Sequence, residues 1–205
     1  MGDRQNELLW NEDLISLLSK RFPKLGIFKG KILKDIFLQK NKKNEFELQL
    51  GFFDQDIVIY NKDNLMDIED LRNSKSIKIH NNNSDKRNTL IIPSIIIELK
   101  YDGVNTHGII TYSNIASDIK SIFPKCKYMF ALRYNSGSSE NKLLRNGKSF
   151  DNIIYFEEGK SHGKTYKKGQ FEAELKKSPK LKNKWECLVE FIELTMKAES
   201  NSFLK

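Results

Sequence analysis

The chain has 205 residues and a mass of 23.9 kDa, with 39% hydrophobic and 30% charged residues. This composition is typical of a soluble globular protein, and no stretch of the sequence approaches the roughly 18 apolar residues that a membrane span requires. The 35 Lys and Arg residues outnumber the 27 Asp and Glu residues, and the resulting net charge of +8 favours a polyanionic partner.

The basic residues are concentrated in two segments on either side of an acidic one. Residues 20–43 contain nine basic residues and one acidic residue, and residues 159–184 contain nine lysines and two glutamates. Residues 45–75 contain eight acidic and three basic residues. Two basic segments around an acidic centre indicate a polyanion held on both sides of a cation-binding site, although a solvated lysine-rich surface explains each segment equally well.

Targeting signals and cofactor motifs are missing from the sequence. The N-terminal residues MGDRQNELLWNEDL lack the apolar run and the small-residue cleavage site of a signal peptide. Cys126 and Cys187 form neither a CxxC pair nor a disulfide framework, so we expect a reducing, cytoplasmic location and no structural zinc site. No GxxxxGK[ST] loop is present, so we expect no nucleotide cofactor.

The first half of the chain predicts a helix and then a β-hairpin. Apolar residues recur at near-helical spacing over residues 5–22, and Pro23 ends this helix. Residues 45–50 alternate between apolar and polar side chains, and a Gly-Phe-Phe-Asp turn region leads to a second strand that Asp56 opens. Residues 61–89 are polar and irregular, which predicts an insertion with one short helix and an Asn-rich tip.

The second half predicts strands that alternate with helices. Apart from Glu98, residues 95–99 are apolar on both faces, as in the central strand of a covered sheet. Ser113 is expected to cap a helix that Pro124 ends, and strands follow at residues 127–134 and 152–156, before a C-terminal helix. The order α-β-β-β-α-β-β-α predicts an α/β fold, a mixed central sheet with helices on both faces.

The strand at residues 95–99 leads into a pair of charged residues. Glu98 and Lys100 face the same way, about 7 Å apart at their Cα atoms, and a plain salt bridge explains this pair at least as well as an active site does. If the strand that Asp56 opens is a neighbour, Asp56 and Glu98 can converge on one Mg²⁺ ion, with the backbone carbonyl of Leu99 as a third ligand. Lys100 would then lie beside the metal and position or polarise an attacking water.

Asp56, followed 42 positions later by Glu98-Leu99-Lys100, resembles the PD-(D/E)xK nuclease superfamily, which includes most type II restriction endonucleases. The order of predicted elements over about residues 5–134 is similar to the α-β-β-β-α-β core of that superfamily. The resemblance implies a Mg²⁺-dependent hydrolysis of DNA phosphodiester bonds, leaving 5′-phosphate and 3′-hydroxyl ends. Asp56 and Glu98 would hold the metal, and Lys100 would serve the water. Gln55 stands where the motif has Pro, and the long spacing requires residues 61–89 to be an insertion.

Further candidates are weaker. The resemblance implies that an acidic residue of the first helix can complete the site, but Glu7 and Glu12 are also explained as solvated helix residues. Glu45 and Glu47 fit an exposed sheet face, and Asp54 fits a turn. Contacts to DNA are expected from loops and basic segments, above all from a polar loop predicted at residues 135–149, although a plain surface loop explains this stretch better. The candidates are His107, Arg133, Arg145 and Lys148.

We therefore expect a single nuclease domain over residues 1–205, with its core at about 5–134 and a basic C-terminal part at about 135–205. The expected function is that of a site-specific type II restriction endonuclease on double-stranded DNA. We expect a homodimer, because cutting both strands of a symmetric site with one active site per chain requires two chains. The alternatives are a repair or junction-resolving nuclease, a non-catalytic DNA-binding subunit with a nuclease-like fold, and a protein-interaction domain whose lysines keep it soluble.

Overall fold

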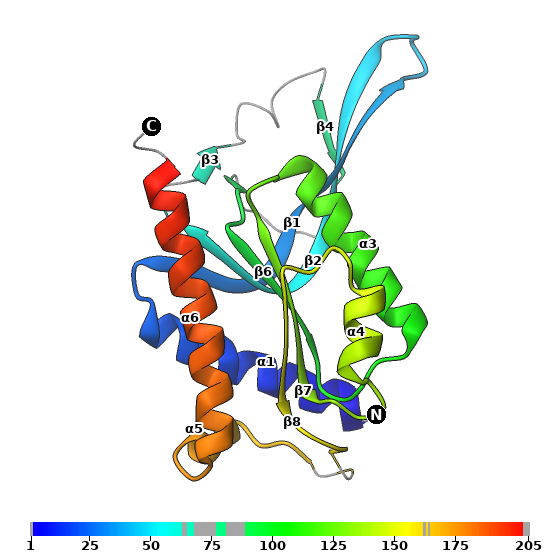
Figure 1. Ribbon diagram of the computed structural model, residues 1–205. Coiled ribbons are helices and arrows are strands. Elements are labelled where there is room, and N and C mark those ends of the chain that lie inside the picture. Colours follow the sequence, from blue (N-terminus) through cyan, green and yellow to red (C-terminus); the bar gives the residue numbers. More distant parts are fainter. Residues whose placement is uncertain are drawn as a thin grey trace.

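A mixed sheet organises the chain, as the computed structural model in Figure 1 shows. The structure describes residues 2–62, 65–67, 77–80, 89–161, 163 and 165–202. The elements of the first half are α1 (Gly2–Arg21), β1 (Leu25–Lys40), β2 (Phe46–Asn61), β3 (Leu65–Asp67), β4 (Ile77–His80) and β5 (Thr89–Ile91). Those of the second half are β6 (Ile95–Lys100), α3 (Thr106–Ile122), β7 (Lys127–Tyr134), α4 (Glu140–Asn146), β8 (Asn152–Glu157), α5 (Gln170–Leu175) and α6 (Pro179–Ser202).

The main sheet has the strand order β1-β2-β6-β7-β8, and β4 pairs with β2 as a sixth strand. β2 is antiparallel to β1 and to β6, whereas β6, β7 and β8 run parallel to one another and β4 runs parallel to β2. Parallel neighbours require crossover connections, and α3 and α4 supply them. The strands therefore form a mixed α/β sheet, as the sequence predicts.

Helices cover both faces of the sheet (Figure 1). On one face, Trp10, Leu14 and Leu18 of α1 pack with residues of α5 and α6 against Ile97 and Leu99 of β6. On the other face, α3 packs against Ile96, and α4 adds Leu143 to the core. β6 is thus covered on both sides, which explains why its first three residues are apolar without alternation.

The predicted hairpin at residues 45–60 was wrong. Residues 46–61 form one continuous strand, and the Gly-Phe-Phe-Asp sequence is not a turn, because these residues pair with β1. The partner strand, at residues 25–40, lies within the basic segment 20–43, for which the sequence predicts no strand. The turn that joins β1 to β2 lies at residues 41–45, where Asn44 adopts a positive φ of 64° and the side chain of Asn41 accepts hydrogen bonds from two backbone amides.

Local boundaries differ from the prediction in two further places. Asn105 caps α3 by accepting the amide hydrogen of Gly108, so the helix begins before Ser113, which is buried inside it. Part of the polar stretch at residues 135–149 forms α4, which Ser139 caps. The short helix predicted within residues 61–89 falls outside the described residues.

The strands β3, β4 and β5 are the described parts of this predicted insertion, although β5 extends two residues beyond it. Among the described residues, no helix is both long enough and apolar enough to cross a lipid bilayer.

Asp13 ties the segment before α5 to α1, which leads to a prediction about stability. Its buried carboxylate accepts hydrogen bonds from the Tyr166 hydroxyl at 2.7 Å and from the amides of Gly169 and Phe171 at 2.7 and 3.3 Å. We expect Asp13→Ala to lower the free energy of unfolding by about 2–4 kcal/mol, because three donors lose a charged acceptor. Glu12→Ala is the matched control, since Glu12 is exposed in an ion pair with Lys168. Urea unfolding of both variants checks this, and equal losses would contradict it.

Candidate active site

The residues of the predicted motif meet at the carboxyl end of β6. Ile57 of β2 pairs with Ile97 of β6, and one further step along this antiparallel ladder sets Asp56 beside Glu98. The Asp56 carboxylate accepts the amide hydrogen of Leu99 through Oδ2 at 3.0 Å. Asp56 therefore satisfies a backbone donor at the point where the β2–β6 ladder ends, and this contact fixes the position of its side chain.

A β-bulge in the β1–β2 hairpin lies at the same place. Phe28 pairs with Val58 and Gly30 pairs with Gln55, so that Asp56 and Ile57 together oppose the single residue Lys29. Bulges redirect side chains and are enriched beside active sites. Here the ammonium of Lys29 lies 3.4 Å from Asp56 Oδ1, whereas the other oxygen of Asp56 contacts β6.

Three carboxylates converge on the ammonium group of Lys100. Its Nζ lies 2.9 Å from Glu98 Oε1, 3.5 Å from Glu7 Oε1 and 3.9 Å from Asp56 Oδ2. With Lys29, the cluster contains three acidic and two basic side chains. The structure thus brings together the three side chains of the predicted motif and adds one acid and one base to them.

The acid comes from α1. Trp10, Leu14 and Leu18 anchor this helix in the core, and their spacing turns Glu7 and Asn11 toward the strand ends. Glu7 accepts the amide hydrogen of Tyr101 through Oε2 at 3.1 Å, and the side chain of Asn11 donates to the backbone carbonyl of Asp56 at 3.1 Å. Of the two first-helix acids considered, Glu7 reaches the cluster, whereas Glu12 pairs with Lys168.

Lys100 also contacts α3, which covers the opposite face of the sheet. Its Nζ lies 4.7 Å from the centroid of the Tyr112 ring, within range of a cation–π interaction. Burial by itself lowers the pKa of Lys100, but the carboxylates of Glu98, Glu7 and Asp56 outweigh burial and raise it above its ordinary value. Lys100 is therefore held as a cation in the metal-free protein.

Glu98 carries the electrostatic cost of the cluster. The residue is 7% exposed, and burial together with the neighbouring charge of Asp56 raises the pKa of Glu98 from 4.5 to about 7, against the opposing effect of Lys100. Two carboxylates this close repel each other in a partly dehydrated environment, and the lysines compensate only in part. A further cation at this position would stabilise the ionised form of Glu98.

The donor atoms of the cluster suit a hard cation such as Mg²⁺, which prefers oxygen ligands and often binds to one or two carboxylates while keeping several waters. Asp56, Glu98 and the carbonyl of Leu99 offer such oxygens. Within the described ranges, no group of three or more His, Cys, Asp and Glu side chains has the arrangement of a preformed metal site. Lys100 Nζ donates to the Leu99 carbonyl at 2.6 Å as well as to Glu98, so it occupies the very acceptors that a metal would use.

Two of the other acidic candidates lie away from the cluster. Glu47 is held by the Asn41 side chain near the turn of the β1–β2 hairpin, and Glu45 is held by the same residue. Asp54 lies within β2, where it pairs with Lys31 across the ladder, and not in a turn.

The residues proposed to contact DNA differ in their exposure to solvent. His107 is exposed in the first turn of α3, Arg145 is exposed at the end of α4, and Lys148 is exposed just after it. Arg133 was wrongly placed among them, because its side chain is 0% exposed and forms ion pairs with Glu157 and Glu174. Its position on β7, in the middle of the sheet, explains this burial.

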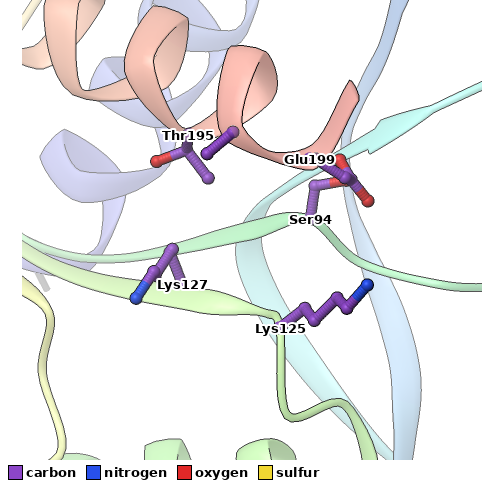
Figure 2. A pocket seen from close by; sticks show the side chains of 6 residues that line it. Ser94, Lys125, Lys127, Thr195 and Glu199 are labelled. Atoms are coloured by element: carbon purple, nitrogen blue, oxygen red, sulfur yellow. The ribbon is translucent and has the colours of Figure 1, made fainter. Parts of the chain in front are cut away.

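A separate cavity of about 270 Å³ lies at the opposite end of β6 (Figure 2). Figure 2 shows Ser94, which precedes the strand, facing α6, whereas Lys100 ends the same strand. The cavity is lined by Ser94, Lys125, Lys127, Thr195, Ala198 and Glu199. None of these residues belongs to the carboxylate cluster, so the cavity and the cluster are distinct features.

Comparison with known proteins gives a likeness of fold. No protein-family model matches the chain, and no curated protein matches it. A solved structure described as the native BbvCI A2B2 tetramer at low resolution superposes with a TM-score of 0.50 and 11% sequence identity. The match covers 85% of this chain and 60% of that one, so the chain spans less than two thirds of the neighbour's length. It supports the predicted fold class, a restriction-endonuclease-like mixed sheet flanked by helices.

The buried position of Glu98 predicts how the stability of the metal-free protein depends on pH. Because the pKa of Glu98 is raised from 4.5 to about 7, the folded chain retains a proton that the unfolded chain releases, and stability falls as the pH rises between these values. We expect Glu98→Gln to raise the free energy of unfolding at pH 8 in EDTA by on the order of 2 kcal/mol. The gain should vanish as the pH falls toward 4.5.

Urea unfolding across this pH range measures the effect, and Glu140→Gln, at an exposed position on α4, is the control. A Glu98→Gln protein that is less stable than the wild type at pH 8 would show that the Lys100 ion pair outweighs the repulsion and the burial.

Proposed function

We propose that this chain is a Mg²⁺-dependent DNA endonuclease of the type II restriction class, which hydrolyses phosphodiester bonds in double-stranded DNA. The observation that carries the proposal is the convergence of Asp56, Glu98 and Lys100 at one strand end. Asp56 lies 42 positions before Glu98 in the sequence, and the cluster would be costly if its only role were structural, because it buries the Glu98 carboxylate with incomplete compensation.

The likeness of fold supports the same class. BbvCI is a type II restriction endonuclease, and its structure is described as an A2B2 tetramer. The net charge of +8 favours a polyanionic substrate, and the phosphate backbone of DNA supplies most of the electrostatic binding energy in such complexes. For this chain we propose a homodimer, because two active sites are needed to cut both strands of DNA.

Each residue of the cluster has a proposed task. Asp56 and Glu98 would hold the metal through their carboxylates, and the Leu99 carbonyl would add a third oxygen. When bound, Mg²⁺ supplies Lewis-acid polarisation of phosphate oxygens and makes water more acidic. Lys100 would orient the attacking water and offset the negative charge that accumulates on the phosphate, which suits a side chain held as a cation.

Glu7 and Tyr112 would act on Lys100 as positioning residues. The Lys100 ammonium donates to Glu98 and to the Leu99 carbonyl, so it would have to release both acceptors for these oxygens to hold a metal. The Glu7 carboxylate at 3.5 Å and the Tyr112 ring at 4.7 Å offer the ammonium other partners close by. Lys100 can therefore remain paired while it makes room for the metal.

Contacts to DNA by His107, Arg145 and Lys148 remain proposals, as do the extent of the nuclease domain over residues 1–205 and a cytoplasmic location. All three of these side chains are exposed, and Arg145 and Lys148 lie on or just after a helix that packs beside α3. Phosphate contacts from such side chains would add affinity that decreases with salt concentration.

Cleavage of a mixed-sequence plasmid tests the proposal. We expect discrete fragments with Mg²⁺ and intact DNA in EDTA. Asp56→Asn keeps an oxygen that can accept the Leu99 amide, so we expect it to fold and yet to cut more slowly by over about 100-fold, as should Glu98→Gln and Lys100→Met. Gel analysis of time courses measures the rates.

Glu140→Gln serves as the control and should cut at the wild-type rate. A smear of fragments would retain the nuclease and exclude site-specific restriction. DNA that binds in a salt-dependent way but stays intact with every divalent cation would contradict catalysis and favour a non-catalytic DNA-binding subunit.

A further inference from the structure

The part of the β1–β2 hairpin that extends past α3 carries an unusual amount of exposed apolar surface. Figure 1 shows this hairpin projecting beyond the end of α3. We call its outer part, residues 35–48, the distal arm. Four large apolar side chains are exposed on it: Ile36 by 52%, Phe37 by 53%, Leu38 by 68% and Phe46 by 60%. Contiguous apolar surface of this kind in a soluble protein marks an interaction site.

Three of these side chains belong to one continuous strip. Leu38 pairs with Leu48, Ile36 with Leu50 and Lys40 with Phe46, and directly paired residues share a face of the sheet. Ile36, Leu38, Phe46 and Leu48 therefore form one row, which we call the apolar strip. The ammonium of Lys40 lies 5.3 Å from the centroid of the Phe46 ring at the outer end of the strip.

The apolar strip continues the protein core. At its inner end Leu50 is buried with Leu33, and Ile122 and Phe123, at the C-terminal end of α3, pack against this pair. The helix stops there, and the same face of the hairpin runs on as the apolar strip. An occupant of the strip would extend the cover that α3 gives to the base of the hairpin.

The charge of the distal arm favours a second copy of the arm as the occupant of the apolar strip. Lys40, Lys42 and Lys43 are balanced by Asp35, Glu45 and Glu47, so the arm has no net charge, although the whole chain carries +8. A surface made for DNA or for an anionic membrane would have an excess of positive charge. A surface that carries both signs in equal number can pair with a second copy of itself.

We propose that the distal arm is the surface through which two copies of this chain associate, with the two apolar strips packed against each other across a twofold axis. With the axis near Leu38, the outer end of one strip faces the inner end of the other. Phe46 of each copy then packs on Ile36 and Leu48 of its partner copy. Such an isologous contact closes a dimer and leaves no strip exposed.

This proposal deepens the proposed function, because it assigns the surface that would join two active sites into one enzyme. It does not depend on catalysis for its test, since the mass of the particle can be measured without DNA or metal. The arm lies outside the carboxylate cluster, so variants of the strip leave the site residues unchanged.

The test measures the mass of the full chain in solution by light scattering. We expect the wild type at twice the chain mass of 23.9 kDa, and Leu38→Glu/Phe46→Glu at the monomer mass, with a dimer dissociation constant raised at least about tenfold. Leu144→Glu and Leu194→Glu are matched controls, because these leucines are 60% and 59% exposed on α4 and α6. Both controls should remain dimers, and circular dichroism should show that every variant is folded.

A second measurement covers the case in which the charged variant fails to fold. In a Cys187→Ser background, Leu38→Cys should give a cross-linked dimer with a short bis-maleimide, whereas Leu144→Cys should not, because only Leu38 lies near the axis. Cys126 is buried and does not compete.

Plasmid cleavage then separates the two ideas. If the chain is a nuclease, the strip variant should accumulate nicked circles where the wild type makes linear DNA. A wild type that is monomeric, or a strip variant that remains dimeric, would overturn the role of the arm while leaving cleavage intact. Strip variants that keep the dimer but bind DNA more weakly would assign the arm to DNA instead.

Discussion

The hydrogen bond from the Leu99 amide to the Asp56 carboxylate is the contact on which the geometry of the candidate site depends. It replaces a backbone acceptor at the end of the β2–β6 ladder, so the position of Asp56 follows from the sheet itself. The bulge opposite Lys29 turns the same side chain, and the parallel pairing of β6 with β7 holds Glu98 and Lys100 on a rigid strand. The carboxylates are therefore held close together by the backbone despite their repulsion, which is the preorganisation that a metal site needs.

In this arrangement the electrostatic repulsion between the carboxylates acts mainly on Glu98. Burial and the charge of Asp56 raise the pKa of Glu98 to about 7, and Lys100 relieves part of the cost by binding Glu98 and the Leu99 carbonyl. Lys100 would therefore have two tasks. Without metal it compensates the charge of the acids, and with metal bound it could turn to Glu7 and Tyr112. We therefore propose that the cluster exchanges the ammonium of Lys100 for a metal cation, and is not a static salt bridge.

Sequence patterns predicted the central part of the fold because its signals are local. β7 was predicted at the residues where it forms, and β6 was recognised because residues 95–97 are all apolar, as expected where a strand is covered on both faces. The hairpin was misplaced because β1 has no clear alternation and its lysines dominate its composition, whereas the Gly-Phe-Phe-Asp sequence gives a turn signal that pairing with β1 overrides. The number of core strands was nonetheless predicted correctly, because the two strands predicted at residues 45–60 are the single strand β2, and β1 supplies the other.

The residues of the candidate site, too, were predicted where the signal in the sequence is local. The spacing of Glu98 and Lys100 was visible in the sequence, and a neighbouring strand for Asp56 was a reasonable expectation. Lys29 and Tyr112 were missed because their contacts depend on a bulge and on the packing of α3, which leave no trace in local spacing. Arg133 was misassigned because a strand position in the middle of a sheet can bury an arginine when two glutamates from later segments reach it.

Calorimetric titration of Mg²⁺ into the DNA-free protein tests the central claim most directly, with the wild type, Glu98→Gln and Lys100→Met compared under the same conditions. The account predicts that the wild type binds Mg²⁺, that Glu98→Gln loses this binding, and that Lys100→Met binds more tightly because the competing ammonium is gone. Equal and negligible heats in all three proteins, at Mg²⁺ concentrations where metal-dependent nucleases bind the ion, would contradict the claim that the carboxylate cluster is a metal site.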